Sequence, residues 1–137
     1  MPLSVYTGKR DIMSQLQKVI VSSTFGGETL SLASAKASIQ TYIQEDVIGH
    51  IWRQGEKMWG GLKDIFDKYS LPAKIQGFHP CPQINFSQGD IKEKFFRSAY
   101  RNGVSLYDVP YVNYSHKDED IEEALIRLEK ACMEIQN

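Results

Sequence analysis

Residues 47–69, VIGHIWRQGEKMWGGLKDIFDKY, carry the apolar pattern that decides the fold of this chain. Apolar residues recur there every three or four positions over about six turns, and Trp52 and Trp59 lie one heptad apart on this stripe. The spacing predicts a helix with one wide buried face. Asp46 is a suitable N-cap, and Leu71-Pro72 ends the helical pattern. Both tryptophans are therefore predicted to be core residues rather than part of a cofactor site.

Three further segments have helical periodicity. The first opens at Gly26-Gly27 and continues until Glu45-Asp46 breaks the pattern, and its early Ala and Ser residues make it slim enough for close packing against another backbone. The second follows the turn at residues 87–90 and stops at Gly103, because glycine commonly ends a helix in the left-handed conformation. The third, residues 118–135, has the clearest amphipathic pattern, and Cys132 on its apolar stripe is predicted to be a small core residue.

Short β-rich segments separate these helices. The prolines of His79-Pro80-Cys81-Pro82, which separates two of these segments, are predicted to prevent regular pairing within residues 79–82. The order of elements indicates an α/β protein of the α+β two-layer type, with helices packed on one face of a small, largely antiparallel sheet. The predicted strands are residues 2–6, 18–23, 73–78, 82–86, 104–107 and 111–114.

The composition restricts the class of protein. A length of 137 residues supports one domain with its own core. Hydrophobic residues at 42% and charged residues at 24% exclude a disordered chain and a coiled coil. A formal net charge of −1 argues against nucleic acid, and no apolar run approaches the ~20 residues that span a membrane. Two cysteines, with no signal-peptide pattern, favour a cytoplasmic location.

The most site-like feature is Ser23-Thr24-Phe25-Gly26-Gly27, which leads into a helix. Free backbone N–H groups and the helix dipole favour an anion at such a position, and two glycines allow a phosphate to approach. Glu28 opposes this, because its carboxylate already occupies the favourable field. On the residues alone, a structural turn is the better interpretation.

No other cluster predicts chemistry. His50, His79 and His116 include no pair at metal-ligand spacing on one helix, and no second pair completes a site with His79 and Cys81. We therefore expect no metal site, an exposed His79 and an unreactive thiol. The serines lack the sequence context of a hydrolase nucleophile.

Several motifs in order resemble one enzyme family. Val21–Ala33 resembles the Ser-Thr-Phe-Gly-Gly-Glu segment of class III, pyridoxal-phosphate-dependent aminotransferases, in the glutamate-1-semialdehyde aminomutase-like branch. Met1–Met13 resembles the strand and turn that follow that family's lysine, and Gly55–Leu62 resembles its Gly-Glu…Gly-Leu helix. Arg101–Val104 and Tyr114–Ile121 resemble its closing segment, although Lys117 stands where the branch usually has threonine. Ser115 or Asp118 is therefore expected to cap the last helix.

The resemblance implies a C-terminal portion of a fold type I enzyme that uses pyridoxal phosphate (PLP). Residues 28–137 would form its small C-terminal domain, and residues 1–27 a remnant of the large domain with its phosphate-contacting loop. The family holds PLP as a Schiff base on a lysine that would lie before Met1, and neither Lys9 nor Lys18 matches it. The resemblance therefore implies no catalytic residue in this chain, an inactive polypeptide when alone, and no PLP bound to it.

The resemblance also implies one cofactor contact and a dimer. Thr24 matches the threonine that contacts the phosphate of the neighbouring subunit's PLP, and Ser23 and Phe25 are weaker matches. The complete enzyme would transfer or migrate an amino group on a small amino or keto acid. The alternative is a non-catalytic binding or assembly module, either a truncated gene product or half of a split enzyme.

Overall fold

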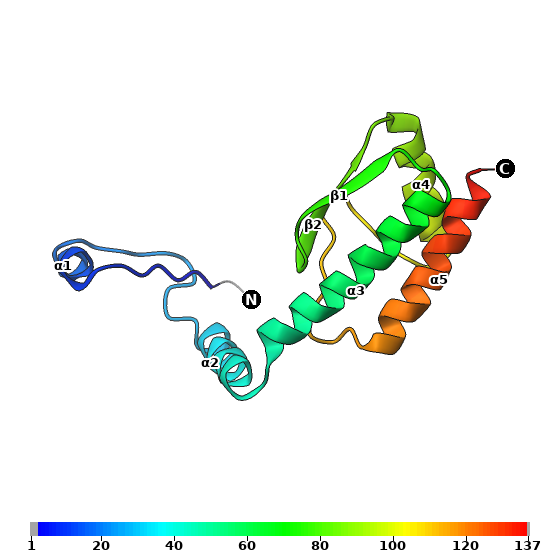
Figure 1. The fold of residues 1–137 in the computed structure, drawn as a ribbon. Helices are drawn as coiled ribbons and strands as arrows, with labels where there is room; N and C mark the ends of the chain where they lie inside the picture. The colour runs from blue at the N-terminus through cyan, green and yellow to red at the C-terminus, as the bar shows by residue number, and fades with distance from the viewer. Residues whose placement is uncertain (1–2, 137) are drawn as a thin grey trace. The chain divides into compact units, whose positions relative to one another are not determined.

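The computed structural model describes residues 3–136, which divide between Asp46 and Val47 into two compact units (Figure 1). The sequence boundary at residues 27 and 28 rests on the resemblance, and that assignment stays a prediction. The first unit contains α1 (Arg10–Met13), the 3₁₀ helix η1 (Ser14–Lys18) and α2 (Thr29–Gln44). The second contains α3 (Val47–Lys68), β1 (Ala73–Phe78), β2 (Cys81–Phe86), α4 (Gly89–Arg101) and α5 (Asp118–Glu134).

Helix α2 confirms the predicted helix after the glycine pair, but it contributes no apolar core. Ser31 is its one buried residue. Leu32, Ile39 and Ile43 share one side of the helix by their spacing and are 50%, 59% and 78% exposed. No large hydrophobic residue among the described residues 3–46 is buried. Within this unit, helical structure forms without the apolar packing that usually stabilises it.

The predicted strands of the first unit do not form. Residues 3–9 have no regular structure, and Pro2 lies outside the described residues. Residues 19–23 follow η1 as irregular chain, although Val19 has the extended dihedrals φ −128° and ψ 150°. A strand needs a neighbour to complete its backbone hydrogen bonds, and the described part of this unit offers none. The prediction at 18–23 was therefore wrong about pairing.

The sheet of the second unit is an antiparallel hairpin of β1 and β2, with Ile75 paired to Ile84. The expectation that proline prevents pairing here was wrong, because the ladder continues to Gly77 opposite Pro82. Ile84 donates its N–H away from β1, to the carbonyl of Asp108 at 2.8 Å. Pro82 lies two residues before Ile84, so its backbone nitrogen also faces away from β1. The N–H that proline lacks would therefore not have bonded to β1, and the ladder between the two strands loses no hydrogen bond.

Residues 104–114 form an irregular segment rather than the two predicted strands. They nevertheless follow β2, because Asp108 accepts from Ile84 and Val112 donates to the carbonyl of Pro80 at 3.2 Å. The partner numbers run in opposite directions, as in an antiparallel pair. Pro110 lies between these two contacts and has no N–H, which explains why no continuous ladder forms.

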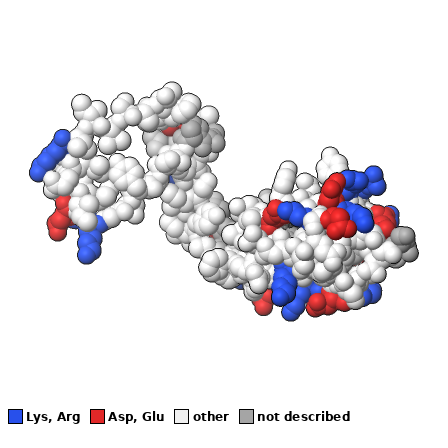
Figure 2. Space-filling view, turned by 90° about the horizontal axis from the view of Figure 1, so that it is seen from above, with Lys and Arg blue, Asp and Glu red and all other residues white. Residues whose placement is uncertain are grey.

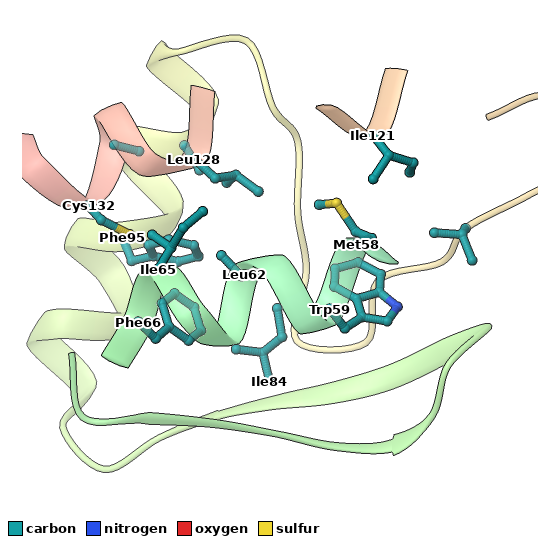
Figure 3. Packing of buried hydrophobic residues seen from close by; sticks show 13 residues of the cluster. Met58, Trp59, Leu62, Ile65, Phe66, Ile84, Phe95, Ile121, Leu128 and Cys132 are labelled. Carbon is teal, nitrogen blue, oxygen red and sulfur yellow. The ribbon is translucent and has the colours of Figure 1, made fainter. Parts of the chain in front are cut away.

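Helices α3, α4 and α5 pack with the hairpin around one core (Figures 1 and 3). The fold is α+β with a small antiparallel sheet, as predicted. Phe66 and Phe95 meet edge to face with ring centroids 5.1 Å apart. Cys132 is fully buried as predicted, and burial raises the pKa of its thiol to about 12. The most buried large side chains are Phe66, Phe95, Leu62, Leu128 and Cys132.

The two tryptophans differ from the prediction that both are core residues. Trp59 is 5% exposed, and its Nε1–H donates to the carbonyl of His79 at 2.7 Å. Trp52 is 42% exposed and lies edge-on to Phe78 and His79. Only the second tryptophan therefore belongs to the core, because the first faces the end of the hairpin.

Candidate functional site

The candidate phosphate contact is a tight turn just before α2. The N–H of Gly26 donates to the carbonyl of Ser23 at 3.1 Å, and the N–H of Glu28 donates to the carbonyl of Phe25 at the same distance. Gly27 has φ +80°, a conformation that favours glycine. A Cβ on Gly26 would lie 3.3 Å from the Ser23 carbonyl oxygen. Glycine thus suits the backbone conformation at residue 27, and a side chain at residue 26 would pack tightly against Ser23.

Glu28 occupies the N-terminus of α2. Its carboxylate accepts from the N–H groups of Leu30 at 3.0 Å and Ser31 at 2.6 Å. The nearby Ser31 hydroxyl and these N–H groups lower the pKa of the Glu28 carboxyl. These two donors are therefore already taken, and an incoming anion would also meet the charge of Glu28.

The Thr24 side chain is the part of the turn that can still donate a hydrogen bond to an anion. Ser23, Thr24 and Phe25 are all exposed, and the Thr24 hydroxyl has no partner among residues 3–136. A hydroxyl donor on a glycine turn fits one edge of a phosphate. The Glu28 carboxylate occupies the N-terminus of α2, so the turn does not form a complete phosphate site. It could supply one of several contacts to the phosphate of PLP. The assignment of Ser23, Thr24 and Phe25 stays a prediction.

Neither lysine of the first unit is part of this turn. Lys9 precedes α1 and Lys18 ends η1, and both side chains are exposed to solvent. Schiff-base lysines, in contrast, are usually desolvated or placed beside another cation. Their surroundings thus agree with surface residues.

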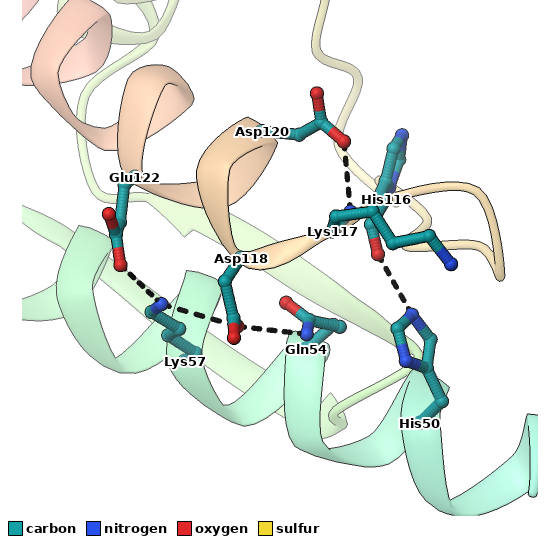
Figure 4. A network of polar contacts seen from close by, with 8 residues as sticks. All are labelled: His50, Gln54, Lys57, His116, Lys117, Asp118, Asp120 and Glu122. Carbon is teal, nitrogen blue, oxygen red and sulfur yellow. Dashed lines mark hydrogen bonds and ion pairs between the residues drawn. The ribbon is translucent and has the colours of Figure 1, made fainter.

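The second unit contains a polar network that the sequence analysis missed (Figure 4). The Asp118 carboxylate accepts from Gln54 Nε2 at 3.0 Å and from Lys57 Nζ at 3.3 Å. Lys57 also contacts Glu122 at 2.7 Å, and His50 Nε2 lies 2.8 Å from the His116 carbonyl oxygen. The sequence feature that pointed to it is the spacing of His50, Gln54 and Lys57, which places the three side chains on one face of the helix.

This network fastens the start of α5 to α3. Hydrogen bonds from Gln54 and Lys57 lower the pKa of Asp118, while the hydrogen bond to Glu122 raises the pKa of Lys57. The cap of α5 differs from the expected Ser115 or Asp118. Lys117 is the N-cap residue, and its N–H donates to the Asp120 carboxylate at 2.9 Å.

Neither the histidines nor the cysteines form a reactive centre in the described chain. His79 is half-buried beside Trp52 rather than exposed as expected, and Cys81 is also half-buried. No group of three or more His, Cys, Asp or Glu side chains within residues 3–136 could hold a metal ion. Over the same residues, no helix is both long and apolar enough to cross a membrane.

Comparison with known proteins shows in which class of protein this fold occurs. No protein-family profile matches the sequence. The structure superposes on the PLP internal aldimine form of the Sphingopyxis sp. MTA144 FumI protein with a TM-score of 0.85 and 17% identity, over 94% of this chain and 32% of that one. The fold is therefore one found within a PLP enzyme.

Curated relatives point to particular members of that class. The chain is 24% identical to a glutamate-1-semialdehyde 2,1-aminomutase of Thermoplasma volcanium, over 98% of this chain and 36% of the relative. It is 25% identical to a 2'-deamino-2'-hydroxyneamine transaminase of Streptomyces kanamyceticus, over 88% and 32%. The resemblance to PLP-dependent aminotransferases and aminomutases is thus confirmed. The chain spans about a third of the length of these relatives.

Proposed function

We propose that this chain is the C-terminal part of a PLP-dependent aminotransferase or aminomutase. The main support is that sequence similarity to such an enzyme extends over 98% of the chain and includes both compact units. The matching fold in a PLP enzyme, over 94% of the chain, supports the same assignment. The reaction would be transfer or migration of an amino group on a small amino or keto acid.

In this proposal Thr24 contributes a hydrogen bond to the phosphate of PLP in a neighbouring subunit of a dimer. Its exposed, unpartnered hydroxyl and the glycine turn support this role. Ser23 and Phe25 flank the contact. When bound, PLP supplies an electron sink for the carbon that carries the amino group. The residues of this chain would hold and orient the phosphate and would transfer no proton.

The proposal assigns the Schiff-base lysine to a part of the enzyme outside these 137 residues. The exposure of Lys9 and Lys18 supports this assignment, because Schiff-base lysines usually lie in a desolvated pocket. The chain alone would then be inactive in amino-group transfer. The cytoplasm would be its place of action.

A second candidate function is a non-catalytic binding or assembly module. The exposed apolar side chains of the first unit favour it, because such surfaces mark interaction sites. The genomic sequence around the coding region distinguishes the enzyme fragment from the non-catalytic module. An in-frame, lysine-bearing segment before the codon for residue 1 would support the enzyme, whereas a stop codon and a promoter there would support the module.

A further inference from the structure

A pocket of about 560 Å³ opens in the second unit between α3, residues 104–112 and the first turns of α5. Its volume is in the range of pockets that bind small molecules, ~300–1,000 Å³. Met58 and Trp59 from α3, Val112 and Ile121 line it and are at most 7% exposed. Figure 3 shows Met58, Trp59 and Ile121 gathered at this side of the core. The deep part of the pocket is thus apolar and shielded from water.

The rim of the pocket is polar and carries one acidic side chain, Asp120. Asp120 Oδ2 accepts from the Lys117 N–H, which fixes the carboxylate at the mouth, and Oδ1 has no hydrogen-bond partner within residues 3–136. Ser105 and Ser115 add hydroxyls to the same rim. At the mouth of the pocket, the Asp120 carboxylate is therefore fixed by one hydrogen bond through Oδ2, while Oδ1 can accept a hydrogen bond from a ligand.

No cation among residues 3–136 neutralises Asp120 by an ion pair. The nearest lysine in sequence, Lys117, directs Nζ to the Tyr114 carbonyl at 3.2 Å and lies 4.7 Å from the centroid of the Tyr114 ring. Figure 4 shows this ammonium pointing away from the Asp120 carboxylate. By contrast, Asp118 and Glu122 share Lys57. Among the described residues that line the pocket, Asp120 is thus the one acidic side chain, and it has no ion-pair partner.

We propose that this pocket binds a small organic amine with a compact apolar body. The body would displace water from the half-buried part of the pocket wall, which includes Val104, Leu106 and Ala124, and the ammonium group would lie against Asp120. A carboxylate of the same shape would be disfavoured by like charge. The site lies wholly within the second unit and is independent of PLP and of the proposed function.

The test measures binding by the fluorescence of Trp59 in the full chain without PLP. The Trp52→Phe background leaves Trp59 as the one tryptophan, since the chain has two. The probes are 2-phenylethylamine, 2-phenylethanol and 3-phenylpropionate, which share an aromatic body and differ in charge. We expect saturable binding of the amine, about fivefold tighter than the alcohol at low salt, as for an exposed ion pair. The carboxylate should bind more weakly than both.

Two variants locate the site and a third serves as a matched control. Asp120→Asn keeps an oxygen that can cap α5, and it should make amine and alcohol bind equally. Glu119→Gln removes one charge from the same turn outside the pocket and should preserve the difference. Ala124→Leu fills part of the pocket and should weaken both ligands at least tenfold, with circular dichroism confirming the fold. Equal binding of the three probes, identical behaviour of Asp120→Asn and Glu119→Gln, or no saturation would overturn the proposal.

Discussion

At the scale of single residues, two glycines of α3 show how local space constrains the sequence. A Cβ on Gly55 would overlap the backbone carbonyl oxygen of His79, the same atom that accepts from Trp59. Gly60 lies on the same helix, where an added Cβ meets nothing within 4 Å. The first glycine therefore allows the hairpin turn to pack on α3, and the second has no such role.

We predict that Gly55→Ala lowers the free energy of unfolding by about 1–3 kcal/mol, because the backbone of the hairpin turn must move. Gly60→Ala is the matched control. It should leave stability unchanged or raise it by up to about 1 kcal/mol, since alanine favours helix more than glycine does. Urea unfolding followed by circular dichroism compares the two variants, and an equal loss in both would refute the packing role of Gly55.

The pH dependence of stability belongs to the same scale. The pKa of Asp118 is lowered in the folded protein by Gln54 and Lys57. Its contribution is therefore present above the unfolded pKa, near 3.8, and is lost as pH falls through the lower folded pKa. Glu129 and Glu134 have lowered pKa values too and act in the same direction.

We predict that Asp118→Asn makes the acid-side loss of stability shallower than in the wild type. Unfolding free energies measured from pH 6 to pH 2, in steps of about half a unit, would show this as a reduced slope below about pH 4. Glu119→Gln, outside the network, serves as the control and should reproduce the wild-type slope. Parallel curves for Asp118→Asn and wild type would show that the network does not favour the charged form.

At the scale of elements, periodicity predicted the helices because a helix is specified by neighbours three and four residues away. The cores of α3, α4 and α5 follow directly from that spacing. Strands 18–23, 104–107 and 111–114 were mispredicted because a strand also needs a distant partner. In the described chain, residues 108–112 make two backbone hydrogen bonds with the hairpin, at Ile84 of β2 and at Pro80 just before it, and residues 19–23 pair with no strand.

The candidate site was predictable to a similar extent. The turn at Thr24 and the competing carboxylate of Glu28 could be read from the glycine pair and the start of the helix. The spacing of Gln54 and Lys57 placed both on one helix face, but their partner Asp118 could not be predicted, because it lies more than sixty residues away in the sequence. Resemblance, rather than residue pattern, gave the link to PLP.

At the scale of the whole molecule, the two units differ in how they are stabilised. Charged side chains are numerous on the face of residues 47–136 that Figure 2 shows. Helix α2, in contrast, has 16 residues and one charge, Lys36. The apolar side chains of α2 are exposed, and the helix carries little charge. Such a surface favours association with another apolar surface.

We predict that the isolated chain self-associates through α2. Sedimentation should give an apparent mass above 15.6 kDa that rises with concentration. The double variant Leu32→Ser/Ile39→Ser should shift it toward the monomer mass, because both side chains lie on the exposed stripe of α2. Ile126→Ser, at a 68% exposed position on α5, is the control and should leave association unchanged. A monomeric wild type would contradict this prediction.

In the function proposed above, these residues contribute a phosphate contact to a PLP enzyme but not its Schiff-base lysine. The direct measurement is to incubate the full chain with PLP, reduce with borohydride and locate any adduct by peptide mass spectrometry. We expect only sparse modification spread over several exposed lysines, unchanged by Thr24→Ala. A stoichiometric adduct at a single lysine would contradict it.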